Sequence, residues 1–113
     1  MQDCLFCKII SGEIPSKKVF ENDKVYAFYD IAPQAPVHVV VVPKEHIESA
    51  NAITKENSVS VADVFEAVPQ IAQRLGIDES GYRVVNNCGS DAGQTVFHIH
   101  FHILGGDVGG KMY

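Results

Sequence analysis

Three of the five histidines alternate with apolar residues in the segment 96–104, which reads Val-Phe-His-Ile-His-Phe-His-Ile-Leu. Side chains of a β-strand point to alternate faces and rise about 3.3 Å per residue, so a strand here would carry His98, His100 and His102 on one face. The opposite face would bury Phe97, Ile99, Phe101 and Ile103. Imidazole can transfer a proton, bind a metal or attack phosphorus near neutral pH. The alternation therefore predicts a β-strand over residues 96–104 with a functional site on its histidine face.

The size and composition of the chain predict one soluble domain over residues 1–113, since 113 residues have room for a single core. No apolar run is long enough to span a membrane, and polar Gln2 and Asp3 follow Met1 in place of a signal segment. An odd count of three cysteines suits a reducing compartment. We therefore expect a cytoplasmic protein without a membrane partner, and the net charge of -5 argues against nucleic acid as a partner.

Hydrophobic periodicity predicts an α+β fold around the histidine strand. Apolar residues recur at steps of three and four over about residues 58–75, which indicates a helix that stops at Gly76 and is kinked or weakened at Pro69. Its apolar positions are Val61, Val64, Phe65, Val68, Ile71, Ala72 and Leu75. We expect a hairpin from residues 17–20 and 24–30, a doubly buried strand at 38–42, a strand at 81–86 and a short helical or irregular opening at 4–10. Such strands with one main helix indicate an antiparallel sheet.

The loop over residues 87–95, directly before the triad, is rich in groups that bind phosphate oxygens. Its glycines let backbone N–H groups approach an anion, and Asn, Gln and Thr side chains add donors. Because this loop leads into three histidines, we expect it to contact a phosphate.

Residues 98–104, with histidine at every second position of the triad, resemble the signature of the histidine triad (HIT) superfamily. Gly93-Gln94-Thr95 before the triad, Gly105-Gly106 after it, and Asp30-Ile31 with Pro36-Val37-His38 are similar to its Hint branch, the histidine triad nucleotide-binding proteins. The resemblance extends from about Asp3 to Gly106. It implies a HIT-like fold with a five-stranded antiparallel sheet, pairing in a homodimer, binding of purine nucleotides and hydrolysis of P–N bonds.

The resemblance also implies a role for each site residue. His100 would be the nucleophile that forms a nucleotidyl-histidine, with His102 and Thr95 near the departing amine and His38 holding or relaying protons beside His100. Asp30 would accept the ribose hydroxyls. The base would lie in an apolar slot of Phe6, Ile9, Ile14, Phe28 and Ile31. Asn87, Gly93, Gln94, Thr95, His100 and His102 would contact the phosphate side.

The segment Cys4-Leu5-Phe6-Cys7 is a C-x-x-C, whose two thiolates can share one metal but need a second pair of ligands for a closed site. His46 has no catalytic assignment, and His98 is the triad member least needed for phosphorus chemistry. Some bacterial members of the family look similar at these positions and carry zinc. We therefore expect a structural zinc on Cys4, Cys7, His46 and His98. A thiol redox pair and two free thiols are the alternatives, and Cys88 has no expected role.

The preferred functional hypothesis is hydrolysis of purine nucleoside 5'-phosphoramidates. One alternative is hydrolysis of dinucleoside polyphosphates by the same histidines. Another is a nucleotide- or zinc-binding interaction module whose catalysis is incidental. The third histidine of the triad argues against the related nucleotidyltransferases, which look similar but have Gln there.

Overall fold

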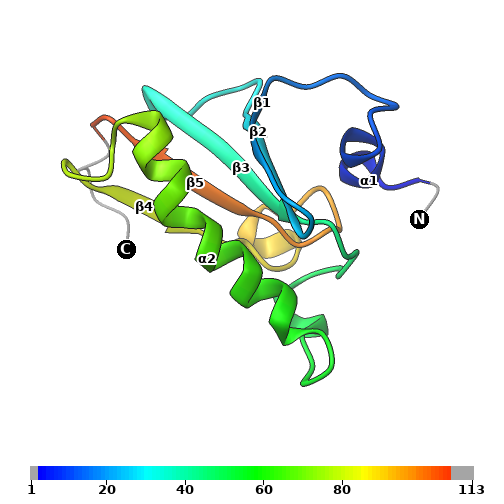
Figure 1. Cartoon of the computed structure of the whole chain (residues 1–113). Helices are drawn as coiled ribbons and strands as arrows, with labels where there is room; N and C mark the ends of the chain where they lie inside the picture. Colours follow the sequence, from blue (N-terminus) through cyan, green and yellow to red (C-terminus); the bar gives the residue numbers. More distant parts are fainter. Residues whose placement is uncertain (1–2, 108–113) are drawn as a thin grey trace.

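The structure, a computed structural model, describes residues 3–107 and arranges them around one antiparallel sheet (Figure 1). The strand order is β1-β2-β3-β5-β4, and every neighbouring pair is antiparallel. The strands are β1 (Lys18–Glu21), β2 (Val25–Tyr29), β3 (Val37–Pro43), β4 (Tyr82–Val85) and β5 (Phe101–Gly105). Short 3₁₀ turns, Ala50–Ala52 and Ser90–Ala92, lie in the connections. The five strands and one main helix confirm the predicted α+β fold.

Helix α2 (Ser58–Leu75) lies across one face of the sheet and has the boundaries expected from its periodicity (Figure 1). It ends at Gly76, whose φ of 73° is the left-handed conformation that glycine adopts without a Cβ penalty. Phe65, one of the apolar positions of the periodic pattern, lies on the flank of the buried stripe and is 48% exposed. No helix within residues 3–107 is long and apolar enough to cross a membrane.

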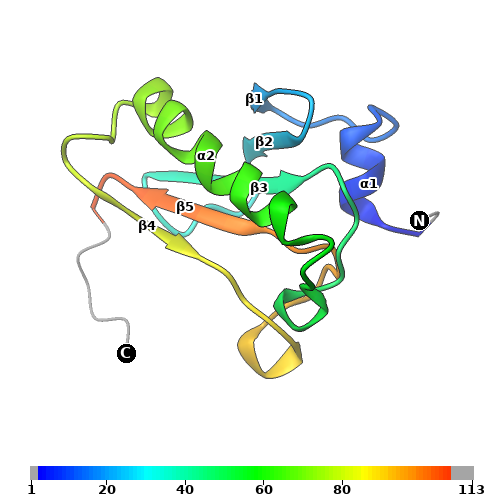
Figure 2. The same ribbon diagram turned by 60° about the horizontal axis from the view of Figure 1, so that its bottom comes forward.

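The two faces of the sheet carry different side chains because successive residues of a strand alternate. Val39 and Val41 of β3 belong to the main core under α2. The other face packs against α1 (Leu5–Ile10), the helical opening expected from the sequence, and Figure 2 shows α1 beside the sheet and separate from α2. This second cluster consists of Phe6, Ile9, Tyr26, Phe28, Val40 and Val42. His38 lies two residues before Val40 and therefore on the same face, and His102 alternates with Phe101 and Ile103 of the main core, so both histidines lie on the α1 face.

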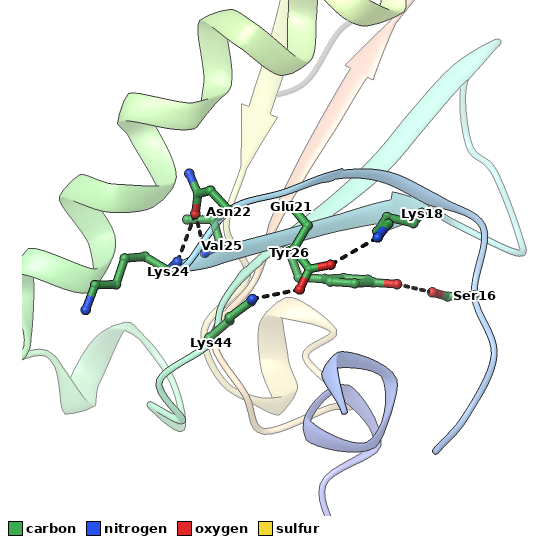
Figure 3. A network of polar contacts seen from close by, with 8 residues as sticks. All are labelled: Ser16, Lys18, Glu21, Asn22, Lys24, Val25, Tyr26 and Lys44. Atoms are coloured by element: carbon green, nitrogen blue, oxygen red, sulfur yellow. Dashed lines mark hydrogen bonds and ion pairs between the residues drawn. The ribbon is translucent and has the colours of Figure 1, made fainter. Parts of the chain in front are cut away.

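Polar contacts close the β1–β2 hairpin, which the sequence also predicted (Figure 3). The side-chain oxygen of Asn22 accepts hydrogen bonds from the backbone N–H groups of Lys24 and Val25, both at 2.9 Å, and so forms the turn. Glu21 accepts from Lys18 and Lys44 at 3.1 and 2.7 Å, and these contacts lower the pKa of its carboxyl group. The network joins the outer hairpin to the end of β3.

Strand β5 begins at Phe101, so the prediction of a strand over residues 96–104 is wrong in its first half. Residues 96–98 form a bend, and Phe97, predicted to be buried, is 52% exposed. The ladder between β3 and β5 ends at the pair Val41–Phe101. Beyond it Pro43 has no N–H to donate, and its carbonyl accepts a hydrogen bond from Nε2 of His98 at 2.8 Å. His98 and His100 therefore precede the strand, and His102 lies within it.

Candidate functional site

Pairing of β3 with β5 brings together histidines that are distant in the sequence. His38 pairs with Leu104 and Val40 with His102, so His38 and His102 are diagonal neighbours on the same face. Their rings lie 5.0 Å apart, and the ring of His100 lies 5.2 Å from that of His102. Burial lowers the pKa values of all three imidazoles, and that of His102 falls to about 4. The three rings are therefore neutral at neutral pH, the state in which an imidazole nitrogen has a free lone pair.

The tautomer of His100 follows from one hydrogen bond. Its Nδ1–H donates to the backbone carbonyl of His98 at 2.8 Å, so Nε2 carries the lone pair. The ring is only 7% exposed and meets Phe6 edge-on at 4.9 Å. The side-chain amide of Asn86 donates to the carbonyl of His100 at 2.9 Å and fixes its backbone. A neutral imidazole held in this way presents Nε2 as a nucleophile.

His38 and His102 form a directed hydrogen-bonded chain. The backbone N–H of Gln34 donates to Nδ1 of His38 at 3.0 Å, so Nε2 of His38 carries the proton and donates to Nδ1 of His102 at 2.8 Å. Nε2–H of His102 is then left as a donor. The family resemblance implies a place for His38 beside His100, but its direct contact in the structure is with His102, because the register of β3 on β5 makes these two residues diagonal neighbours.

Asp30 completes this chain. Its Oδ2 lies 3.3 Å from Nε2 of His38 and 4.0 Å from Nδ1 of His102, and its Oδ1 accepts from the backbone N–H of Ala32. Asp30, His38 and His102 are close enough to share a metal ion. A proton on Nε2 of His38 occupies the position where a metal would bind, so the arrangement favours proton transfer.

The predicted zinc ligands Cys4, Cys7, His46 and His98 come together, with their ligand atoms all within 4.8 Å of one another. Sγ of Cys4 lies 3.4 Å from Nδ1 of His98, and Sγ of Cys7 lies 3.4 Å from Nδ1 of His46. A tetrahedral zinc with ordinary bond lengths separates sulfur and nitrogen ligands by about 3.5 Å. Because Nε2–H of His98 donates to Pro43, its Nδ1 lone pair faces the thiols. The donor set therefore fits zinc.

Electrostatics at this cluster favour a bound cation. Burial and the neighbouring thiol of Cys4 raise the pKa of Cys7 to about 11, while burial lowers the pKa of His98 to about 4. The protein alone thus holds a neutral imidazole, ready to coordinate, beside a thiol that is hard to ionise. A bound divalent cation would lower the pKa of Cys7 again, because metal coordination deprotonates a thiol.

The loop before the triad differs from the expectation that its donors face a phosphate. The Gln94 side chain is 4% exposed, accepts from Gly89 N–H at 2.8 Å and donates to the carbonyls of Glu48 and Val96. The backbone N–H groups of Gly93 and Gln94 donate to Ser90 and Gly89 within the loop. These donors shape the loop internally. Thr95 is exposed and borders a shallow pocket that is also lined by Cys4, Leu5, His46, Val96 and Phe97.

The expected base slot is partly assembled. Phe6, Ile9 and Phe28 pack together, with the rings of Phe6 and Phe28 5.6 Å apart, and Ile14 packs against them. Ile31 is fully exposed beside Asp30 and contributes an open apolar surface. Asn87 is half-buried after β4.

Sequence reasoning missed three groups that organise the site. They are the amide of Asn86, the carbonyl of Pro43 and the backbone N–H of Gln34. Asn86 immediately follows the last residue of β4, where its position in the sequence offered a weak signal. The two backbone groups have no signal in the sequence.

Comparisons with known proteins agree on one family. A family model described as "HIT domain" matches residues 11–109. An uncharacterized HIT-like protein of Helicobacter pylori is 47% identical over 103 residues, 91% of this chain and 96% of that protein. A purine nucleoside phosphoramidase of Escherichia coli is 40% identical over 111 residues, 98% of this chain and 93% of that protein. The solved structure of a HIT family hydrolase from Clostridium thermocellum has a TM-score of 0.95 at 47% identity and covers 99% of this chain and 97% of its own.

Proposed function

Because the chain belongs to the HIT family, we propose that it is a hydrolase of purine nucleoside 5'-phosphoramidates that works through a nucleotidyl-histidine. The observation that carries the proposal is the lone pair on Nε2 of His100, beside His102, whose Nε2–H has no hydrogen-bond partner within residues 3–107. The 40%-identical relative named as a purine nucleoside phosphoramidase supports the substrate class.

The first step joins His100 to the substrate. Nε2 of His100 attacks the α-phosphorus, a phosphorus–nitrogen bond to the enzyme forms and the bond to the substrate amine breaks. In the protein alone His38 and His102 are neutral, but the negative charge of the bound phosphate, like that of the Asp30 carboxylate, raises their pKa values and favours one additional proton on the pair. Nε2 of His102 gives this proton to the departing amine, so the amine leaves uncharged.

The second step releases the nucleotide. Water attacks the phosphorus, the bond to His100 breaks and the proton lost by the water returns to the His38–His102 pair. The products are a nucleoside monophosphate and the free amine, and all three histidines regain their starting states. Throughout, Nδ1–H of His100 stays on the carbonyl of His98 and stabilises the positive charge that the ring gains on attack.

Nucleotide binding follows from the residues around these histidines. We assign the ribose to Asp30 and the base to the apolar slot that ends in the exposed side chain of Ile31. Thr95 is assigned to the leaving-group side, and Asn87, Gly93 and Gln94 to the loop that bounds the phosphate. Gln94 and Gly93 act there by shaping the loop, because their donors are used within it or on Glu48.

Zinc, when bound to Cys4, Cys7, His46 and His98, supplies a structural cross-link and no chemistry at phosphorus. It ties the start of α1 to the segments that precede β5 and follow β3.

We also propose that two copies of the chain pair through β4, an edge strand whose four residues are all only half-buried. Light scattering of the purified protein measures its mass in solution and so tests for a dimer.

The test of the function is the variant His100→Asn, whose side-chain amide can replace Nδ1–H on the carbonyl of His98 but has no Nε2. Turnover of adenosine 5'-phosphoramidate should fall by about 1000-fold or more, while binding of AMP stays close to wild type. Wild-type protein mixed with substrate and quenched should contain adenylylated His100 by mass spectrometry. The assignment is wrong if the variant keeps more than about a tenth of wild-type turnover.

A further inference from the structure

We propose that the zinc cluster positions the nucleophile: metal at Cys4, Cys7, His46 and His98 fixes the tautomer and orientation of His100. The inference rests on the proposed function, since it concerns the same histidine. It assigns Phe6 and His98 as positioning residues that act through His100. Two separate contacts, one through the backbone and one through a side chain, connect the cluster with the ring.

The first connection is the backbone of His98. This residue is fully buried and uses three groups at once: Nδ1 faces the sulfur atoms of Cys4 and Cys7 at 3.4 and 3.5 Å, Nε2–H donates to Pro43, and its carbonyl accepts Nδ1–H of His100. Residues 96–98 form a bend outside the β3–β5 ladder, and the peptide that carries this carbonyl is held by the N–H of Ile99, which donates to the carbonyl of Ile47 at 2.6 Å. A metal bond to Nδ1 would add a restraint on the side chain of His98 itself.

The second connection is the ring of Phe6, which lies between the two cysteines in the chain. It contacts His100 edge-on at 4.9 Å and His98 at 6.2 Å. Helix α1 has six residues, and a helix this short is not stable by its own hydrogen bonds. Its start is fixed by Sγ of Cys4, which accepts from the N–H of Cys7 at 3.3 Å, and by the contacts of both thiols with His46 and His98. Zinc on these thiols and imidazoles would therefore hold Phe6, the ring against which His100 packs.

Loss of the metal should release both restraints together. The carbonyl of His98 then moves, so the proton of His100 distributes between Nδ1 and Nε2, and Phe6 no longer confines the ring. Only the Nε2 lone pair attacks phosphorus, so the chemical step slows while the ribose and base contacts remain. Removing the outer hydrogen-bond partners that orient a residue of a functional site typically lowers activity about 10- to 100-fold.

The experiment compares zinc-loaded protein with the same protein after chelation, using ¹⁵N-labelled histidine. In loaded protein the ring nitrogens of His100 should show one protonated Nδ1. In stripped protein they should show exchange between both tautomers, and kcat on the phosphoramidate should fall about 10- to 100-fold with a smaller change in KM. The proposal is overturned if stripped, folded protein keeps the Nδ1 tautomer and more than half of kcat.

The variant Phe6→Leu tests the second connection and does not require removal of zinc. It should retain zinc by elemental analysis yet lower kcat and broaden the His100 resonances. The matched control is Phe20→Leu, an equally buried phenylalanine at 7% exposure that packs in the main core, which should change stability and leave the tautomer unaltered. Equal effects of the two variants on His100 would refute a positioning role.

These readouts separate the two proposals. If loaded wild-type protein does not turn over the phosphoramidate, the proposed function fails, and the tautomer of His100 with and without zinc still decides the coupling. If turnover is normal and the tautomer does not depend on zinc, the coupling fails alone. The variant Cys88→Ser, at a cysteine outside the cluster, controls for the loss of a thiol and should leave zinc content and tautomer unchanged.

Discussion

Acid should destabilise this protein, and His102 should account for about 2 to 3 kcal/mol of the loss between pH 7 and pH 4.5. Burial first, and then the neighbouring His100 and His38, lower the pKa of His102 from 6.5 to about 4. The side chain is 19% exposed, so solvent screening reduces this effect little. In the unfolded chain the imidazole regains its ordinary pKa, so over this range the unfolded state binds a proton that the native state does not. The contribution of His102 is therefore full above about pH 6.5 and falls as the pH approaches 4, at up to about 1.4 kcal/mol per pH unit.

The variant His102→Asn isolates this contribution. The Oδ1 atom of Asn can take the place of Nδ1 and accept from Nε2–H of His38, but the side chain does not titrate. Urea unfolding at about pH 7 and pH 4.5 gives the free energy of unfolding of both proteins, and wild type should lose about 2 to 3 kcal/mol more than the variant. Contributions from His98 and the cysteines are common to both proteins and cancel. Equal losses would show that His102 is not held neutral by the fold.

Three further predictions concern other parts of the molecule. Asp30→Ala should weaken the binding of AMP by about 1 to 3 kcal/mol more than the binding of its 2'-deoxy analogue, as measured by calorimetric titration. Equal weakening of both ligands would mean that Asp30 does not contact the 2'-hydroxyl of the ribose. A Cβ at Gly105 would lie 2.7 Å from Cδ1 of Ile77, so Gly105→Ala should cost about 1 to 3 kcal/mol of unfolding free energy. Ile77→Val removes that methyl group and should recover part of the cost, whereas strict additivity in the double variant would contradict the clash. Protein purified without added zinc should contain close to one zinc per chain, and Cys4→Ser should lower both zinc content and Tm, the latter by about 10 °C, which elemental analysis and a thermal melt measure.

The sequence was sufficient where a local pattern determines the structure. The spacing of apolar residues and Gly76 located helix α2 to the residue, and the β-rich runs around Asn22 located the hairpin. The cluster of Cys4, Cys7, His46 and His98 was predicted from the C-x-x-C together with the resemblance to the HIT family, which left His46 and His98 as the histidines free to complete a closed site.

Prediction failed where a long-range contact overrides the local pattern. Alternation at residues 96–100 is a strand pattern, yet Phe97 is exposed because the chain bends where His98 bonds to Pro43. The amide of Gln94 donates to the carbonyl of Glu48, a residue 46 positions away, which the sequence did not indicate, and its contact with a phosphate stays a prediction. The partner of His38 depended on strand register, which the sequence left open.

The position of β3 beside β5 has a consequence for how the protein acquires activity. These strands pair Val37 with Gly105, so the sheet closes only after almost the whole chain is available. Contacts between such distant segments form slowly, because a long loop must close before they stabilise it. Neither half of the polypeptide holds a complete active centre, since His38 lies on one segment and both His100 and His102 on the other. During refolding, nucleotide affinity should therefore emerge in a single late phase together with the β3–β5 ladder, and after the helical signal of α2.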